Sequence, residues 1–367
     1  MKLSAKFIWN LKRIIPFGII WFFLGVLFLL VEHLALGHQS NALDSAIKLQ
    51  TDVVIFALLV ITLIGLILGT IEVLWLKRLF EKKQFTTNII GKFFIYILFF
   101  LLVIFITYPI AASLELETSI IDKRVWDKYA YFFFSITNLS AMIQLSFSLL
   151  ISLFYAEISN NVGQNVLLNF FTGKYHKPIV EDRIFMFVDM KDSTPIAESL
   201  GHKKYFALLR SYYNDFSNAI IENYGEVYQY VGDEIVITWK LQKGIVNNRC
   251  IRCFFDMKSD LKKKDKRYKS TYGISPSFKA ALHYGKVTTG EIGALKKDIF
   301  FTGDVLNTTA RILGLCTIYK KDLLVSQNLV DKLLLKEEFD SLNIGNMELK
   351  GKKETVKVVA ISNKPLK

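Results

Sequence analysis

The stretch Ile184–Phe–Met–Phe–Val–Asp–Met–Lys–Asp–Ser–Thr194 decides the fold of the C-terminal half of this chain. Its first five residues are apolar, aromatic or β-branched, which is typical of a buried strand. The strand ends in the carboxylate of Asp189, and a helical pattern runs from Pro195 to about Tyr224. A carboxylate at a strand end, just before a helix N-terminus, suits a metal-bound polyphosphate, because the backbone amides of the helix start face the phosphates.

A second segment, Gly225–Trp239, alternates in the β manner around Gly232–Asp233, which predicts a hairpin. Glycine permits the turn, and we expect Asp233 to be exposed at its tip. Either aspartate taken alone would be ordinary turn or capping chemistry. Together, on neighbouring strand ends, Asp189 and Asp233 can share a pair of divalent cations, and hard oxygen ligands favour Mg²⁺ or Mn²⁺.

Five motifs in this half of the chain resemble those of class III adenylate and guanylate cyclases, in the same order. The resemblance covers about residues 183–361, roughly half of the chain. Coincidence does not account for five motifs in sequence. They are the metal motifs Phe187–Val–Asp–Met–Lys–Asp–Ser–Thr194 and Tyr230–Val–Gly–Asp233, the strand and glycine turn Ala281–Gly290, the asparagine and arginine motif Gly303–Asp–Val–Leu–Asn–Thr–Thr–Ala–Arg311, and the terminal hairpin Glu348–Leu–Lys–Gly–Lys352.

The resemblance implies a ferredoxin-like α/β domain with a mostly antiparallel sheet, assembled as a head-to-tail homodimer. In that family the active sites form between the two chains, and the metal aspartates come from one chain while the asparagine and arginine come from the other. The implied reaction is attack of a ribose 3′-oxygen on the α-phosphorus of a nucleoside triphosphate, with pyrophosphate leaving.

The resemblance also implies a role for each site residue. Asp189, Asp233 and the Met190 carbonyl would bind two Mg²⁺ or Mn²⁺ ions, which lower the pKa of the 3′-hydroxyl and steady the triphosphate. Arg311 would stabilise developing charge on the α-phosphate, and Asn307 would hold the ribose in line. The residues expected at the substrate phosphates are Lys350, Ser193 and Thr194.

Base specificity departs from the family pattern at two positions. Adenylate cyclases carry Lys, and guanylate cyclases Glu, four residues before the second metal aspartate, where this chain has Gln229. The partner position holds Phe300, which offers packing but no hydrogen bond. A glutamine amide can serve adenine or guanine. The chain lacks the glutamate that guanylate cyclases carry at this position, which favours ATP as the substrate. GTP, or relaxed specificity for the base, remains the alternative.

Two other functions fit parts of this pattern. The first is a degenerate cyclase that acts as a membrane receptor or scaffold, but Asp189, Asp233, Asn307 and Arg311 are all present. The second is another palm-like nucleotidyl transferase such as a diguanylate cyclase. That enzyme needs a Gly–Gly–Asp/Glu–Glu/Asp–Phe turn, which the segment 231–234 does not match.

The N-terminal half is a different kind of sequence. Of the 367 residues 52% are hydrophobic, and the apolar residues gather in four runs near 14–36, 53–76, 93–114 and 131–155. About 20 apolar residues span a bilayer, so the four runs predict transmembrane helices in contact with membrane lipid. No run carries Lys, Arg, Asp or Glu near its centre, except for Glu72 toward the end of the second.

Charge asymmetry predicts the orientation. Lysine and arginine gather before the first run and between the second and third, so the N-terminus and the C-terminal domain are expected in the cytoplasm, with the chain a multi-pass protein of the inner membrane. The outer loops, of about 13 to 16 residues, leave no room for a folded sensor. The predicted domains are a four-helix membrane domain (1–155), a coupling segment (156–180) and a catalytic domain (181–367).

Three further features of the sequence bear on function. Ser140, Gln144, Ser148 and Ser152 share one helical face, which predicts packing within one bundle, a contact between subunits, or a lipid or ligand site. The basic run 258–269 is interpreted as a solvated surface, and no nucleic-acid motif accompanies the net charge of +13. The three cysteines are expected to be buried small hydrophobes, although Cys250 and Cys253 have the spacing of half a zinc site.

Overall fold

The computed structural model of the chain describes residues 4–36, 51–76, 85–335, 338–348 and 355–364. The chain divides into two compact units: a helical unit, Ile8–Leu168, and an α/β unit that begins at Asn169. This is the expected class of fold, an apolar helical part followed by a sheet domain. The finer domain boundaries at residues 155 and 180 stay predictions.

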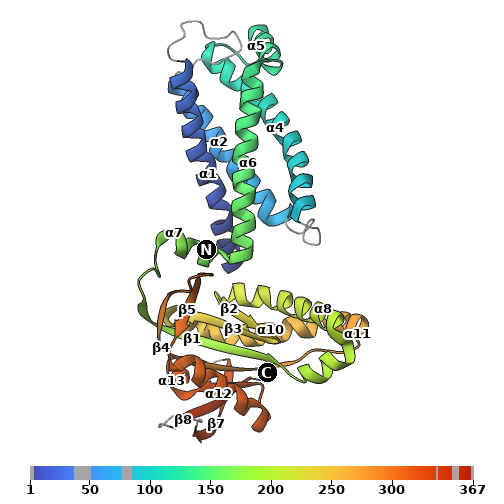
Figure 1. Cartoon of the computed structure of the whole chain (residues 1–367), viewed down its shortest axis with the longest axis vertical. Helices are drawn as coiled ribbons and strands as arrows, with labels where there is room; N and C mark the ends of the chain where they lie inside the picture. Colours follow the sequence, from blue (N-terminus) through green and yellow to red (C-terminus); the bar gives the residue numbers. More distant parts are fainter. Residues whose placement is uncertain (1–3, 37–50, 77–84, 336–337, 349–354, 365–367) are drawn as a thin grey trace. The chain divides into compact units, whose positions relative to one another are not determined.

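Within the described residues, four helices of the first unit are long and apolar enough to cross a membrane. They lie side by side in Figure 1. Each satisfies its backbone hydrogen bonds internally, which hydrocarbon surroundings demand. The second continues into a π-helical turn, Glu72–Leu76. The bounds are α1 Ala5–Leu36, α2 Thr51–Ile71, α4 Phe85–Glu115 and α6 Ile136–Val162.

The predicted start of the fourth run, residue 131, is wrong. Residues 131–133 belong to a separate helix, α5 (Lys123–Phe133), and α6 begins only at Ile136. Ser135 caps α6, because its hydroxyl accepts the backbone N–H of Asn138 at 3.2 Å. Hydropathy alone does not reveal this break between the two helices, because the apolar residues continue across the cap.

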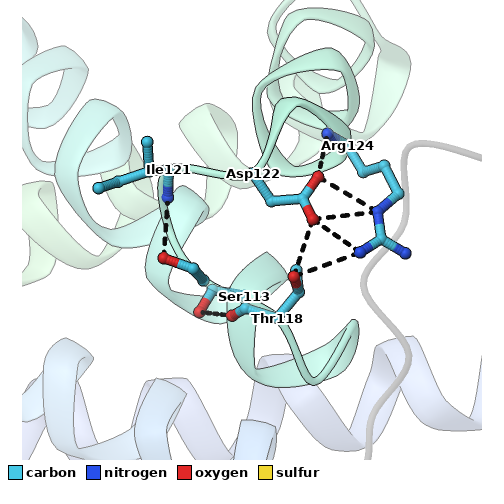
Figure 2. Close-up of polar contacts among 6 residues, drawn as sticks. Ser113, Thr118, Ile121, Asp122 and Arg124 are labelled. Carbon is cyan, nitrogen blue, oxygen red and sulfur yellow. Dashed lines mark hydrogen bonds and ion pairs between the residues drawn. The ribbon is translucent and has the colours of Figure 1, made fainter.

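A compact turn joins α4 to α5, as Figure 2 shows. Asp122 caps α5 by accepting the backbone N–H of Arg124 at 2.9 Å, and its carboxylate also accepts from the Arg124 guanidinium at 2.6 Å and the Thr118 hydroxyl at 2.8 Å. These hydrogen bonds, those of Arg124 foremost, hold the pKa of Asp122 well below its ordinary value. The Ser113 hydroxyl donates to the Thr118 carbonyl at 2.9 Å. This predicted outer loop is therefore a hydrogen-bonded turn and not a separate domain.

Two polar groups stabilise the interior of the helical unit. Glu72 is buried, and it accepts hydrogen bonds from Lys92 and, at 3.2 Å, from the hydroxyl of Tyr96, both on α4. The indole N–H of Trp21 on α1 donates to Ser152 on α6 at 2.9 Å. Ser152 therefore packs within one bundle, which agrees with the first interpretation of the polar stripe.

The chain leaves α6 as a second, shorter helix. Gly163 interrupts the helix with a φ of 92°, and α7 (Gln164–Thr172) follows. The expected helical continuation is present, with one glycine break that composition did not indicate. Gly173, with a φ of 63°, then ends α7 as predicted for this stretch.

The strand that follows is held by a buried polar cluster. Arg183 is 2% exposed, and its guanidinium donates to Glu181 at 2.7 Å, Glu226 at 3.1 Å and the Tyr175 hydroxyl at 3.3 Å. The Tyr175 carbonyl accepts the backbone N–H of Glu291 at 3.0 Å. The segment after α7 is thus fixed to the sheet by both side chain and backbone.

The described residues of the second unit form an eight-stranded sheet, with the order β2-β3-β1-β4-β6-β8-β7 and β5 paired to β4. Of the strand pairs in this described sheet only β4–β6 is parallel, so the expectation of a mostly antiparallel sheet is confirmed. The bounds are β1 Ile179–Met190, β2 Glu226–Val231, β3 Glu234–Lys240, β4 Phe278–Ile292, β5 Asp298–Thr302, β6 Leu323–Ser326, β7 Phe339–Met347 and β8 Val356–Asn363.

Helices cover both faces of this sheet (Figure 1). Even-numbered residues of β1, such as Met186, pack under α8, α10 and α11, while Phe185 and Phe187 pack under α12. All three cysteines are buried in these cores, as predicted. The helices are α8 Ser193–Glu222, α9 Leu241–Gly244, α10 Arg249–Lys263, α11 Asp265–Tyr272, α12 Asp304–Ile318 and α13 Gln327–Val330, with a 3₁₀ turn at Val246–Asn248.

The basic run 258–269 is only partly a solvated surface. Asp215 of α8 is 2% exposed, and Lys264 and Tyr268 donate to it at 2.6 and 2.7 Å, with Arg267 also paired to it. A buried carboxylate needs such partners to offset the loss of water. Part of the run therefore neutralises an internal charge, which the sequence interpretation missed.

Candidate active site

Asp189 lies at the end of β1, on the face of the sheet that α12 covers. Side chains alternate along a strand, so Asp189 shares the face of Phe185 and Phe187. In the sheet it pairs with Glu234 of β3 on one side and Lys279 of β4 on the other. The predicted strand is thus present, and its terminal carboxylate lies beside the β2–β3 turn, at one end of the central strands.

Asp233 occupies that turn. Gly232 adopts a φ of 61°, the left-handed conformation that glycine takes readily. The hydroxyl of Tyr213 on α8 donates to the Gly232 carbonyl at 2.8 Å and fixes the turn against the helix. We expected Asp233 to be exposed at the tip of the turn. In the structure it is half-buried, because the turn folds back onto α8.

The two aspartates come together as predicted. Burial raises the pKa of Asp189, and the neighbouring charge and hydrogen bond of Asp233 add to the increase, against the opposing effect of Lys279. The Lys279 ammonium lies 3.2 Å from the Asp189 carboxylate. Glu234 belongs to the same acidic group: burial, followed by the charges of Asp189 and Asp233, raises its pKa to about 7.

This arrangement fits a divalent cation. Within the described part of the chain no three His, Cys, Asp or Glu side chains form a ready-made metal site, so the candidate donors are two carboxylates and the backbone carbonyl of Met190. These are hard oxygen ligands of the kind that Mg²⁺ and Mn²⁺ prefer. Burial is the main reason that the pKa of Asp189 is raised, and the adjacent charge of Asp233 raises it further while Lys279 lowers it. A bound cation would lower this pKa.

Ser193 and Thr194 form the first turn of α8, directly after the candidate metal carboxylate. Asp192 precedes them with a φ of 55°, which turns the chain sharply from strand to helix. The Lys191 N–H donates to the Ser277 carbonyl at 2.9 Å and anchors this turn to the start of β4. The helix start therefore lies beside the aspartates, as a phosphate site requires.

Asn307 and Arg311 lie one helical turn apart on α12. The opposite side of α12 is buried against the sheet through residues such as Ile312 and Leu313, while Asn307 is exposed and Arg311 half-exposed. Their side chains are therefore available to a ligand or a partner on the outer face of α12. The spacing of four residues places them on one face, as expected.

Within one chain these two residues do not meet the aspartates. Val305 packs over Gly285, where a Cβ would lie 2.7 Å from the valine, and Gly285 pairs with Arg183 of β1. Asn307 follows Val305 by two residues, so it lies near that end of β1, ~20 Å along the strand from Asp189. Among the described residues, no hydrogen bond or ion pair joins Asn307 or Arg311 to either carboxylate.

The candidate base-specificity residues lie on β2 and β5, two strands that do not pair with each other in the sheet. Gln229 is exposed on β2, beside a register shift between Val227 and Gln229, and Phe300 is 43% exposed on β5. The residues next to them in sequence touch: the rings of Tyr228 and Phe301 are 4.9 Å apart. This aromatic contact, which sequence reasoning did not identify, joins the neighbours of Gln229 and Phe300 and not the two residues themselves. Lys350 lies outside the described residues.

Sequence reasoning also missed the residues that support the aspartates. Lys279 was detectable in principle, since a lone cation inside the apolar strand Phe278–Leu282 needs an acidic partner. Tyr213 and Glu234 gave no comparable signal. Their roles depend on how α8 folds across the hairpin.

Comparison with known proteins agrees with this geometry. A model of the adenylate and guanylate cyclase catalytic domain matches residues 177–362, half of the chain. The chain belongs to this family. The matched range contains the candidate site residues, so the cyclase fold expected from the five motifs is confirmed.

Curated relatives of this chain are named adenylate cyclases. The chain is 32% identical over 210 residues to Adenylate cyclase 2 of Rhizobium meliloti (strain 1021), covering 57% of this chain and 58% of that protein. It is 25% identical over 185 residues to the Adenylate cyclase of Anabaena cylindrica, covering 48% of this chain and 36% of that protein. The chain therefore spans little more than half the length of these relatives, or less.

A solved structure shares the fold. A bacterial light-regulated adenylyl cyclase superposes with a TM-score of 0.53 at 20% identity, covering 62% of this chain and 66% of that chain. At this identity the likeness supports the fold of the cyclase domain and not its substrate.

Proposed function

We propose that this protein is a membrane-anchored nucleotidyl cyclase that converts ATP to 3′,5′-cyclic AMP and pyrophosphate at a homodimer interface. The observation that carries the proposal is the meeting of Asp189 and Asp233 at one sheet edge of a cyclase domain, with concentrated negative charge and hard oxygen donors. Four apolar helices precede this domain, which supports the membrane anchor.

The residues divide the chemistry between them. Two Mg²⁺ or Mn²⁺ ions, when bound by Asp189, Asp233 and the Met190 carbonyl, supply activation of the 3′-hydroxyl and charge for the triphosphate. The first turn of α8, with Ser193 and Thr194, faces the phosphates with its backbone amides. The 3′-hydroxyl gives up its proton to solvent, and its oxygen bonds to the α-phosphorus while the bond from that phosphorus to the bridging oxygen breaks and pyrophosphate leaves.

Asn307 and Arg311 complete the site from the second chain. Arg311 would stabilise negative charge on the α-phosphate, and Asn307 would hold the ribose in line for attack. Both side chains lie on the outer face of α12, and among the described residues neither bonds to the aspartates of its own chain, which supports a head-to-tail dimer. Lys350 is proposed to pair with the terminal phosphates.

ATP is the proposed substrate for two reasons. Gln229 replaces the glutamate that guanylate cyclases use, and the curated relatives are named adenylate cyclases. GTP is the alternative, because an amide can rotate to serve guanine and Phe300 adds no hydrogen bond. The orientation with both termini in the cytoplasm, where the triphosphates are, follows from the positive charge of the short loops.

Turnover tests the proposal. Full-length protein in detergent is given ATP or GTP with Mn²⁺ or Mg²⁺, and cyclic nucleotide is measured for wild type, Asp233→Ala and Asp340→Ala, an exposed carboxylate of β7. Cyclic AMP from wild type and Asp340→Ala, with a loss of at least ~10²–10³ in Asp233→Ala, is expected. Cyclic GMP alone would reassign the base. No product from folded, dimeric protein would identify a degenerate receptor.

A further inference from the structure

A cavity of about 220 Å³, partly open to its surroundings, lies between α1, α2, α4, α5 and α6 of the helical unit. Small residues line this space: Gly25, Ala57, Ala111 and Ala141. A larger side chain at Ala57, Ala111 or Ala141 would occupy part of the volume, whereas a Cβ at Gly25 would meet Ile61 of α2 at 3.0 Å. The void therefore depends on small residues of α2, α4 and α6, while Gly25 lets α1 approach α2.

The walls are almost entirely apolar and uncharged. None of the described lining residues is Asp, Glu, Lys, Arg or His. An ionised ligand would therefore lose its hydration without gaining a counter-charge, which is costly in such surroundings. The cavity selects against charged molecules.

Two polar side chains of α6 provide hydrogen bonds inside this apolar space. Ser148 is 4% exposed and lines the cavity, and its hydroxyl has no side-chain partner among the described residues. Gln144 lines it one turn away and donates to Ser140 at 3.3 Å, which leaves its carbonyl oxygen to accept. Thr107 differs, because its hydroxyl already donates to the Val103 carbonyl at 2.9 Å. Gln144 and Ser148 are thus the polar end of the site.

Size sets the scale of the ligand. An apolar cavity of about 150 Å³ holds benzene, so a cavity of 220 Å³ has room for roughly nine non-hydrogen atoms. We propose that this cavity binds a neutral amphiphile of about that size, an alkyl or aryl body carrying one hydroxyl or carbonyl group that bonds to Ser148 and Gln144.

The depth of the polar end favours a free amphiphile over a bilayer phospholipid. Ser148 lies twelve residues after Ile136, the first residue of α6, or ~18 Å along the helix. In the proposed membrane-spanning orientation of α6 this is near the middle of ~30 Å of hydrocarbon. A phospholipid would bring only its hydrocarbon chain to that depth, because its ester groups stay at the interface.

Photolabelling of the full-length protein in phosphatidylcholine nanodiscs tests the proposal. The probe is a diazirine-bearing octanol, and labelled residues are mapped by mass spectrometry. We expect labelling on the lining residues of α6 and its neighbours, with unlabelled 1-octanol competing at least about tenfold better than n-octane. Labelling confined to other surfaces, or equal competition by n-octane, would overturn it. The readout does not depend on cyclase turnover, so it succeeds or fails independently of the proposed function.

Variants separate recognition from general partitioning. Ala141→Phe should fill the cavity and abolish labelling of its lining, and Ala57→Leu, on another helix, should do the same if the first variant does not fold. Ser148→Ala should weaken competition by 1-octanol about fivefold and leave n-octane unchanged, as loss of one hydrogen bond predicts. Ser146→Ala, two residues away and outside the lining, is the matched control. Unchanged octanol competition in Ser148→Ala would contradict the assigned polar end.

Discussion

The ammonium of Lys279 lies 3.2 Å from the carboxylate of Asp189, across the β1–β4 pair. The same ammonium donates to the hydroxyl of Thr317 on α12 at 2.9 Å, which holds the lysine side chain in place. A cation is thus already placed against one of the two candidate metal ligands.

Removing that cation should tighten metal binding. In Lys279→Met the candidate ligands lose a competing positive charge, so the Mn²⁺ concentration for half-maximal binding should fall on the order of tenfold. Titration calorimetry of full-length protein without nucleotide measures this directly. Lys286→Met, an exposed cation of the same strand, should bind Mn²⁺ as wild type does. Weaker binding in Lys279→Met would mean that the lysine orients Asp189 and does not compete with the ion.

The separation of Asn307 and Arg311 from the aspartates predicts complementation between inactive chains. Asp233→Ala and Arg311→Ala should each be inactive alone, while their co-expression should restore about a quarter of wild-type turnover. Half of the randomly paired dimers are mixed, and a mixed dimer has one intact site of two. The double variant Asp233→Ala/Arg311→Ala, co-expressed with Asp233→Ala, gives the background, because no pairing of these chains contains an intact site. Failure of the mixed chains to regain activity, with mixed dimers shown to form, would argue for a site within one chain.

Base preference should follow the charge at position 229. Gln229→Glu can accept the guanine N1–H and amino group, and Gln229→Lys can donate to adenine N1, so the ratio of kcat/KM for GTP over ATP should rise about tenfold in the first and fall about tenfold in the second. Steady-state rates with each nucleotide measure the ratio. Gln327→Glu, on α13, changes the same residue type away from β2 and should leave the ratio unaltered. Equal ratios in all variants would remove Gln229 from base recognition.

Asp322 should make stability depend on pH. Burial raises the pKa of this carboxyl, but hydrogen bonds from Lys191 and Lys258 outweigh that effect and leave the pKa below its ordinary value. A carboxyl whose pKa is lower in the folded state than in the unfolded state stabilises the protein at pH values above its unfolded pKa of about 4. This stabilisation is lost as the pH falls through the folded pKa.

The Asp322→Asn variant tests this dependence by thermal unfolding of the full-length protein. Its Tm should lie about 2–4 °C below wild type at pH 7, and the gap should narrow as the pH falls below the unfolded pKa of about 4 and close once the pH is below the lowered folded pKa. Asp331→Asn, whose carboxylate accepts from Gln327 at 2.7 Å, serves as the control and should show no such closing gap. A gap that is constant with pH would assign the loss to packing and not to charge.

The sequence predicted the parts of this protein that local patterns encode. An apolar strand ending in Asp189, and a glycine turn carrying Asp233, are specified by neighbouring residues, and the sheet forms them as expected. Long apolar runs likewise predict the four helices, because hydrocarbon length and backbone hydrogen bonding leave few alternatives. The cap at Ser135 was missed because a single hydroxyl decides it against a continuous apolar background.

Only the tertiary structure decided which distant residues meet. Lys279 reaches Asp189, Lys264 reaches Asp215, and Lys92 reaches Glu72 through packing of segments far apart in the chain. Sequence periodicity gives the face on which a side chain lies but not its partner across an interface. For the same reason the polar stripe of α6 could not be assigned beforehand: Ser152 bonds to Trp21, while Ser148 lines a cavity that exists only because neighbouring helices approach it with small residues.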